Sequence, residues 1–437
     1  MTELAPDPAP PLMPSRQGGA RGFIRRYWLE VTLWKRILLG LILGVAFGLA
    51  VGEQAMAVKW IGDLFVRLIR MIVTPLVFFS IVSGIAGMGD VKRLGSIGAR
   101  TLLMYLALTA VAVSVGLGLG TLFQPGAGMD FVGTTPQVLG EAPTLGTYLM
   151  SIVPLNPFAA LSQGDIPAII FFAILIGLGI LIIGEPAAPV ARLFQIGSDI
   201  MLVLVRVIME LAPFGVFALV AWVMGTSGPS TFVHVFLLAC ALVLGCLFQT
   251  LVVHGSVIRL VAGLPVIPFF RDIADAVIVA FSTSSSAAVL PVAMRVAEKN
   301  LGVSHTVAST TLPLGTTLSM DGTALYVALL AMFSAQAFGV ELTLAQYLMV
   351  GLVCIIVAVG TAPVPSASLF MLAAVLQVIG LSAEQTALVV GFILPFDRIL
   401  DMTRTVPNAT SDLVVAVTVA KWEGELDEVA YRAKPVE

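Results

Sequence analysis

The sequence predicts an all-α polytopic membrane protein with about eight transmembrane helices and two re-entrant helical hairpins. Three observations indicate this fold class. Of the 437 residues, 58% are hydrophobic and 11% are charged, whereas a soluble domain carries about 25% charged residues. The mean hydropathy is +1.03. Apolar runs of about 20 residues, the length that crosses a bilayer, recur along most of the chain.

The first 35 residues are predicted to form an N-terminal cytoplasmic tail (1–35). Residues 1–22 are rich in Pro, Gly and Ala and lack the apolar region of a signal peptide. Basic residues, among them Arg26 and Lys35, precede the first apolar run at 37–51. Because Lys and Arg concentrate on the cytoplasmic side of a span, this run is expected to begin in the cytoplasm.

The second and third runs fit the same orientation. Residues 60–88 form the second run, and a loop with Lys92 and Arg93 follows it. Residues 101–123 form the third run, and the long connection at 124–148 contains no Lys or Arg. This asymmetry places the basic loop in the cytoplasm and the long connection outside.

Three more runs complete residues 36–265, which are predicted to hold spans one to six. The fourth run, at 149–183, contains three prolines, so a fragmented or kinked helix is expected. The fifth and sixth runs lie at 191–223 and 231–261. His254 stands in the sixth run with no partner readable from the sequence, which favours a structural role over a proton relay.

The pattern changes beyond residue 265. Residues 269–281 are too few to cross a bilayer, and five consecutive Ser and Thr residues at 282–286 separate them from a second short apolar run at 287–296. Two half-length helices that meet at a polar tip form a re-entrant hairpin. Non-helical backbone at membrane depth is tolerated only where it lines a protein-enclosed or wet cavity, so this tip is expected to border a polar site.

A broken span and a second hairpin follow. The apolar run at 307–338 is interrupted around Asp321 and Gly322, where backbone carbonyls and one carboxylate can gather around a hard cation. Short apolar arms at 344–359 and 369–378 then flank a tip rich in Pro and Ser. The order of hairpin, broken span, hairpin and polar span indicates an internal duplication of the inverted-repeat type.

The last span carries a polar face inside apolar sequence. Each charged side chain near the centre of a bilayer costs at least about 2.5–3.5 kcal/mol, so such charges face a partner or a wet cavity. Three acids and two arginines cannot all neutralise one another, which favours a site for cations and a charged solute; an ion-paired structural helix is the alternative. The residues within about 100° of one another on the helix are Asp397, Asp401, Arg404, Thr405, Asn408 and Asp412.

Other classes of protein fit the sequence less well. The net charge of −3 comes without a basic, aromatic-rich patch, so no nucleic-acid binding is expected. The three cysteines lack metal-ligand spacing with any histidine and are expected to be buried. An intramembrane aspartyl protease built on Asp397 and Asp401 would present both acids from a single helix, so the protein is predicted not to be an enzyme. A channel would need a pore-lining repeat, which the sequence does not offer.

These motifs resemble the dicarboxylate and amino-acid:cation symporter family, which includes glutamate transporters and their prokaryotic homologues. The resemblance covers nearly the whole chain after the tail. The motifs that carry it are GDLFVRLIRMIVTPLVFFSIVSG at 62–84, LPVAMRVA at 290–297, LPLGTTLSMDGTALY at 312–326, the VPSAS tip at 364–368, and DRILDMTRTVPNATSD at 397–412.

The resemblance implies an elevator transporter of the cell inner (plasma) membrane, usually a homotrimer in the lipid bilayer, with both termini cytoplasmic. Spans one, two, four and five would form the scaffold. Spans three, six, seven and eight would move with both hairpins. On this division residues 266–422 are the transport core with two hairpins and spans seven and eight, and residues 423–437 are a C-terminal cytoplasmic tail.

The function implied is secondary active import of acidic amino acids, glutamate and aspartate, coupled to a sodium and/or proton gradient. Arg404 would bind the side-chain carboxylate of the substrate and Asp401 its amino group, while Asp397 is expected to be a structural partner. A C4-dicarboxylate or neutral amino-acid symporter of the same fold is the alternative. The other substrate-binding residues implied by the resemblance are Ser284, Ser285, Ser286, Thr323, Val364, Ser368, Thr405 and Asn408.

The resemblance also implies sites for coupling cations and no other cofactor. Ser319 and Leu108 depart from the oxygen ligands that relatives place around Asp321, so a proton on Asp321 is an alternative to sodium. The first implied site combines carbonyl groups of Gly315, Ser319 and Asn408 with the carboxylate of Asp412; the second combines Asp321 with Thr109 and Tyr105; the third lies near Thr317, Met320 and Thr361.

Overall fold

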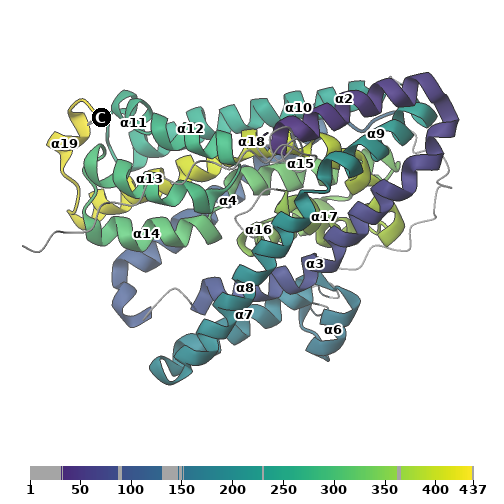
Figure 1. Cartoon of the computed structure of the whole chain (residues 1–437). Coiled ribbons are helices and arrows are strands. Elements are labelled where there is room, and N and C mark those ends of the chain that lie inside the picture. Colours follow the sequence, from purple (N-terminus) through teal and green to yellow (C-terminus); the bar gives the residue numbers. More distant parts are fainter. Residues whose placement is uncertain are drawn as a thin grey trace, which may run out of the picture.

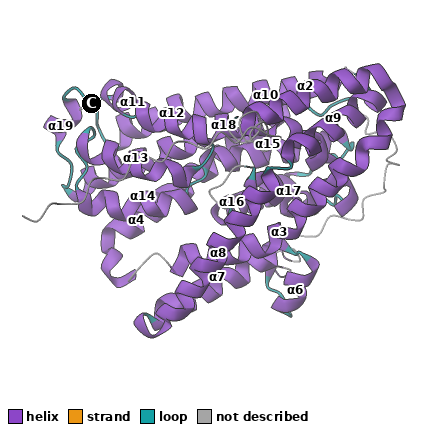
Figure 2. Ribbon diagram, in the orientation of Figure 1, coloured by secondary structure: helices purple, strands orange, loops and turns teal. Residues whose placement is uncertain are grey.

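The computed structural model describes residues 31, 33–86, 91–129, 146, 150, 152–228, 231–361 and 366–435. Within these residues the chain is helical, and the only β-type pairing is an isolated antiparallel bridge between Val303 and Leu426. Figure 1 shows the helices along the chain, and Figure 2 shows the same view by secondary structure. The prediction of an all-α fold is therefore confirmed for the described part of the chain.

Several helical stretches have the length and composition of membrane spans. Six shorter apolar helices accompany them, and three of these belong to the arms of the two predicted hairpins. The arrangement of eight spans stays a prediction. Within the described part of the chain, the five stretches that are long and apolar enough to cross a membrane are Lys35–Leu68, Gly95–Phe123, Glu185–Met209, Val233–Val261 and His305–Ala337.

A first group of helices comes from the N-terminal half of the chain. Its members are α2 (Leu33–Val51), η2 (Gly52–Val58), α3 (Lys59–Ala86), α6 (Pro157–Gln163), α7 (Ile166–Ile183), η3 (Glu185–Ala187), α8 (Ala188–Met209) and α9 (Ala212–Ser227). Helix α2 runs along α9, and α3 packs against α7, α8 and α9. The fourth predicted span is fragmented into α6 and α7, as the prolines indicated, and the fifth is divided between α8 and α9.

Close contact between α2 and α9 depends on a stripe of glycines. Gly40, Gly44 and Gly48 recur every four residues, and a Cβ atom on any of them would lie within 2.7 Å of a carbonyl oxygen of α9. Small residues at this spacing allow two membrane helices to approach closely. An ion pair of 2.6 Å between Arg36 and Glu210 joins α2 to the end of α8.

A second group of helices surrounds α18, a helix of 41 residues. Helix α18 packs against α4, α10, α12, α14, α15 and α17, so the polar face of the last span is enclosed by protein. The members of this group are α4 (Val91–Phe123), α10 (Thr231–Leu247), the π-helical segments η4 (Phe248–His254) and η5 (Val257–Val261), α11 (Val266–Asp272), α12 (Ala274–Thr283), α13 (Ser286–Lys299), α14 (His305–Leu318), α15 (Asp321–Ala337), α16 (Leu344–Gly360), α17 (Ala367–Val378) and α18 (Ala383–Glu423).

Each predicted hairpin corresponds to a pair of short helices, and their re-entrant placement in a membrane stays a prediction. Helices α12 and α13 pack against each other, as do α16 and α17. The tips contain Ser284 and Ser366, which adopt φ angles of 54° and 63°. This left-handed conformation is uncommon outside glycine and is often found at functional sites. Residues 362–365 of the second tip, which include the predicted site residue Val364, lie outside the described residues.

The predicted break in the seventh span is also present. Helix α14 ends at Leu318 and α15 begins at Asp321, so the backbone leaves the helix at Ser319 and Met320. All residues of the most apolar window in this stretch are buried inside the protein. The break therefore lies among neighbouring helices, where its free carbonyl groups can be used by a site.

The C-terminal segment folds back onto the first hairpin region. Helix α19 (Glu428–Arg432) lies beside α11, where the C-terminus is marked in Figure 1. The Tyr431 hydroxyl donates to the Pro265 carbonyl at 2.9 Å, and the Asp427 amide donates to the Gly302 carbonyl at 2.8 Å. A hydrogen bond from Lys421 lowers the pKa of the Glu428 carboxyl. The predicted tail thus contains a folded segment.

The cysteines match their predicted role. Cys246 and Cys354 are buried, Cys240 is partly buried, and all three are free thiols. Burial of a free thiol among apolar side chains is ordinary for cysteine.

Candidate functional site

The polar face of α18 is enclosed, and its two central charges are paired with each other. Arg404 Nε donates to Asp401 Oδ1 at 2.9 Å, and Arg404 Nη2 lies 2.8 Å from the same oxygen. Both side chains are buried. The remaining guanidinium nitrogen, Nη1, donates to the Ser368 hydroxyl at the start of α17. Charge-assisted pairs of this kind are strong, and in a buried position neither partner can be left without the other at low cost.

Asp401 also holds the tip of the second hairpin. Its Oδ2 atom accepts a hydrogen bond of 2.8 Å from the backbone amide of Ser366. Ser366 is the residue in left-handed conformation that precedes α17. The contact between α18 and this hairpin therefore runs through the carboxylate to which the resemblance assigns the substrate amino group. A ligand that engages Asp401 would act directly on the position of the tip.

Tyr326 and Asp397 complete the surroundings of Arg404. The guanidinium carbon of Arg404 lies 4.6 Å from the centroid of the Tyr326 ring, a cation–π distance. The Tyr326 hydroxyl donates to Asp397 Oδ1 at 2.8 Å, and Arg404 Nη1 lies 4.0 Å from the same oxygen. Tyr326 was not identified from the sequence, because one tyrosine in an apolar helix gives no signal of its contact with α18.

Asn408 joins the polar face of α18 to the broken span. Its Oδ1 atom accepts a hydrogen bond of 2.8 Å from the amide of Gly322, and its Nδ2 atom lies 3.5 Å from the Thr323 hydroxyl. A Cβ atom on Gly322 would lie 1.8 Å from the Arg404 carbonyl oxygen, so only glycine fits there. The structure therefore brings together Thr323 and Asn408. Thr405 is buried on the same helix, and its hydroxyl donates to the Asp401 carbonyl at 2.7 Å.

The first hairpin supplies the three predicted serines. Ser285 caps α13 by accepting a hydrogen bond of 3.4 Å from the Ala288 amide. Ser284 and Ser286 are buried, and the Ser284 hydroxyl has no hydrogen-bond partner among the described residues. Helices α12 and α13 both pack against α18. A buried hydroxyl without a partner at this tip is available to a ligand.

The first predicted cation region has the features of an oxygen-lined site. Asp412 is buried, and its Oδ1 atom has no hydrogen-bond partner among the described residues. A Cβ atom on Gly315 would lie 2.1 Å from this oxygen and 2.4 Å from the Tyr105 hydroxyl, so glycine keeps the space open. The Ser319 hydroxyl lies 2.9 Å from that of Ser411. An unpaired carboxylate oxygen beside non-helical backbone suits a hard cation.

The second predicted cation region is arranged differently. Asp321 accepts a hydrogen bond of 3.1 Å from the Thr109 hydroxyl, so these two expected members of the region lie side by side. Its other oxygen, Oδ2, lies 3.2 Å from Gln249 Nε2 and 3.0 Å from His254 Nε2. Tyr105, the third expected member, donates to the Thr311 carbonyl at 3.0 Å. The sequence did not indicate Gln249, and it indicated a structural role for His254.

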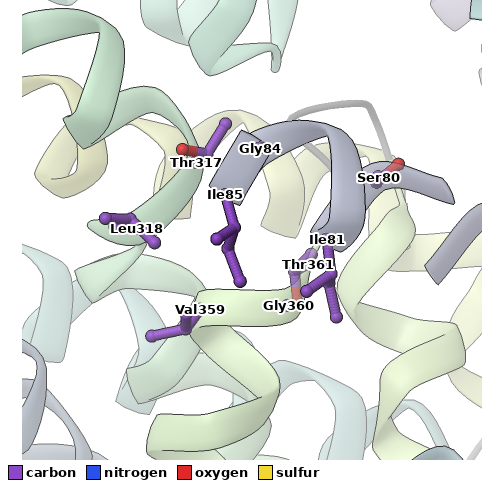
Figure 3. Close-up of a pocket in the computed structure, with 9 residues that line it drawn as sticks. All are labelled: Ser80, Ile81, Gly84, Ile85, Thr317, Leu318, Val359, Gly360 and Thr361. Carbon is purple, nitrogen blue, oxygen red and sulfur yellow. The ribbon is translucent and has the colours of Figure 1, made fainter. Parts of the chain in front are cut away.

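The third predicted cation region borders a small cavity of about 30 Å³. Figure 3 shows Thr317 and Thr361 among its lining residues, opposite Ser80 and Gly84 of α3. The cavity is about the size of one water molecule. Met320 is buried at the break between α14 and α15. The region therefore lies where the broken span and the second hairpin meet α3.

Two hairpins and a broken helix that enclose buried charges of both signs define the class of α-helical membrane transporters. Irregular backbone in an apolar protein is tolerated where it lines a site, and here it converges on α18. The chain belongs to the sodium:dicarboxylate symporter family, whose family model matches residues 33–422.

Individual relatives agree with this assignment. The chain is 36% identical over 413 residues to the proton/sodium-glutamate symport protein of Bacillus caldotenax, a match that covers 91% of this chain and 96% of that protein. It is 34% identical over 423 residues to the proton/glutamate-aspartate symporter of Escherichia coli (strain K12), with 91% and 94% covered. It is 33% identical over 415 residues to the C4-dicarboxylate transport protein of Anaeromyxobacter sp. (strain K), with 93% of each covered.

Proposed function

We propose that the protein is a secondary active symporter that imports acidic amino acids, glutamate and aspartate, with a sodium and/or proton gradient. The observation that carries the proposal is the buried pair of Arg404 and Asp401. An acidic amino acid offers a carboxylate to the guanidinium and an ammonium group to the carboxylate. It can therefore replace the internal ion pair by two new ones and leave neither Arg404 nor Asp401 unpaired.

The same pair discriminates against the alternative substrates. A C4-dicarboxylate satisfies Arg404 but separates it from Asp401 without giving Asp401 a positive partner. A neutral amino acid gives Asp401 an ammonium partner but lacks the side-chain carboxylate that is proposed to pair with Arg404. Loss of one partner from a buried pair costs about 3–5 kcal/mol, so both substrates are expected to bind more weakly. C4-dicarboxylate transport is kept as the second candidate because one similar protein carries that name.

Substrate binding is expected to rearrange the second hairpin. Arg404 donates to Ser368 and Asp401 accepts from Ser366, so both charges hold the start of α17. When the substrate takes over Arg404 and Asp401, these contacts change together. Val364, in the same tip, and the first-hairpin serines Ser284, Ser285 and Ser286 are proposed to close the cavity from both sides.

Two coupling cations are proposed to bind beside the substrate. Asp412 with the carbonyl groups of Gly315, Ser319 and Asn408 would hold one cation, and oxygen atoms near Thr317, Met320 and Thr361 would hold another. The open Oδ1 atom of Asp412 supports the first site, and the small cavity at Thr317 and Thr361 supports the second. Asn408 belongs to both the substrate and the cation environment, which would couple the two binding events.

Transport is proposed to follow an elevator mechanism. The packing supports this, because α2, α3, α7, α8 and α9 contact one another as a scaffold, whereas α4 and α10–α18 surround the site. The second hairpin, α16 and α17, contacts α3 and α7 of the scaffold. We infer a protein of the plasma membrane with cytoplasmic termini, and a homotrimer by resemblance to the family.

The decisive experiment is uptake into proteoliposomes of labelled aspartate, glutamate, succinate and serine. Each substrate is offered under an imposed sodium gradient, an imposed proton gradient, or neither. Accumulation of aspartate or glutamate driven by one of the gradients is expected. Gradient-driven uptake of succinate with no uptake of either amino acid would replace the proposal by the second candidate.

A further inference from the structure

Both oxygen atoms of the Asp321 carboxylate have hydrogen-bond partners among side chains of the protein. The Thr109 hydroxyl lies 3.1 Å from Oδ1. Gln249 Nε2 and His254 Nε2 lie 3.2 Å and 3.0 Å from Oδ2. All four side chains are completely buried. Asp412, by contrast, keeps one oxygen without a partner among the described residues.

Gln249 and His254 reach Asp321 together because of a local change in helix type. Residues Phe248–His254 form a π-helical segment, in which backbone hydrogen bonds join residues five apart. Gln249 and His254 are five residues apart, a little over one π-helical turn, so their side chains point in similar directions. In an α-helix, positions five apart differ by about 140° in direction, and only one of the two would face Asp321.

The two side chains present nitrogen atoms, not oxygen atoms, to the carboxylate. Gln249 Nε2 donates to Asp321 and also lies 3.4 Å from the Leu108 carbonyl oxygen. His254 Nε2 lies 3.0 Å from Asp321 Oδ2, so a single hydrogen atom lies between the two. Sodium, like other hard cations, is bound by several oxygen atoms. Here the second carboxylate oxygen and one nearby carbonyl face nitrogen donors.

We propose that Gln249 and His254 take the place of a coupling cation at Asp321, so that the chain binds sodium at no more than two sites, the Asp412 region and the region of Thr317 and Thr361. Gln249 and His254 are thereby determinants of how many cations accompany each substrate. This inference deepens the proposed function and rests on it for the identity of the transported solute. The number of sodium ions bound can be measured without that solute.

The first test counts sodium on the full-length protein purified in detergent. Equilibrium binding of radioactive sodium is measured at saturating concentration, both without substrate and with aspartate. At most two ions per chain are expected in either condition. Three ions per chain would overturn the inference. If the wild-type protein binds no aspartate, glutamate or succinate, the proposed function fails, but the sodium count without substrate still decides this inference.

The second test removes the Gln249 and His254 side chains from the surroundings of Asp321. The variant Gln249→Ala/His254→Ala removes both donors and leaves Asp321 buried with Thr109 alone. Sodium is then expected to raise the unfolding temperature of this variant by more than it raises that of the wild type, because an ion that binds only the folded state stabilises it. An equal or smaller sodium-dependent shift would contradict the inference. The sodium count on the wild-type protein applies even where this variant does not fold.

The matched control lies on the same π-helical segment. Thr250 is buried and borders an apolar cavity of about 470 Å³, together with Phe270 and Ile273. Its hydroxyl has no hydrogen-bond partner among the described residues. Thr250→Val therefore changes the segment without touching Asp321. Its sodium-dependent shift is expected to equal that of the wild type, which would attribute a change in the double variant to the lost donors.

Discussion

Replacement of Asp401 by asparagine is the sharpest test of how the substrate is chosen. Aspartate and succinate share four carbons and two carboxylates and differ by the amino group alone. In the proposed site that amino group binds the Asp401 carboxylate, whereas succinate gains nothing from it. Asp401→Asn keeps an oxygen that can accept the 2.8 Å hydrogen bond from the Ser366 amide, so the hairpin contact is preserved while the negative charge is lost.

The magnitude follows from burial of the pair. Removal of one charge from a buried ion pair costs about 3–5 kcal/mol, and about 1.4 kcal/mol corresponds to a tenfold change in affinity. The affinity for aspartate should therefore fall by about a hundredfold or more. Succinate loses no ammonium contact, so the preference for aspartate over succinate should fall by a similar factor.

The assay is competition between labelled aspartate and unlabelled succinate in proteoliposomes, with wild type and variant compared at equal protein. Asp397→Asn is the control, because Asp397 lies 4.0 Å from Arg404 Nη1 and also carries a buried negative charge. Its ratio of aspartate to succinate affinity should stay near that of the wild type. A preference in Asp401→Asn that remains within about fivefold of the wild type would refute the assignment of Asp401, since about 1 kcal/mol is too little for a buried charge pair.

Three further predictions concern the same site. Arg404→Ala should abolish uptake of labelled aspartate and glutamate, because the substrate carboxylate loses its guanidinium; normal uptake would show that the site is wrongly assigned. Gly322→Ala should lower the unfolding temperature and stop transport, since its Cβ atom would lie 1.8 Å from a backbone oxygen, whereas Gly118→Ala, with no atom within 4 Å, should behave as wild type in both assays. Asp412→Asn should reduce the number of sodium ions bound per chain by one in equilibrium binding, and an unchanged count would place that cation elsewhere.

Much of the site was predictable because its signals are local in the sequence. A run of five hydroxyl residues between half-length apolar helices predicted the first hairpin, and the structure places Ser284 at its tip. Asp321 and Gly322 predicted the break between α14 and α15. The polar face of α18 predicted the proximity of Asp401 and Arg404, because residues three apart on a helix lie on one side.

Contacts across the chain were not predictable in the same way. Tyr326 and Arg404 are far apart in sequence, and nothing in an apolar helix marks which residue will pack against a guanidinium. The division of the fifth span into α8 and α9 agrees with the break that Pro213 predicts.

The sequence by itself determined that this is a helical membrane protein, where its hairpins and helix break lie, and which face of the last span is charged. These properties follow from composition and from the spacing of polar residues along one helix. Tertiary structure decided what each charge contacts: Asp401 with Arg404 and the tip of the second hairpin, Asp412 with an open oxygen, and Asp321 with Gln249 and His254. The last contact lies in a π-helical segment, in which residues five apart point in more similar directions than in an α-helix, a difference that the pattern of apolar residues does not record.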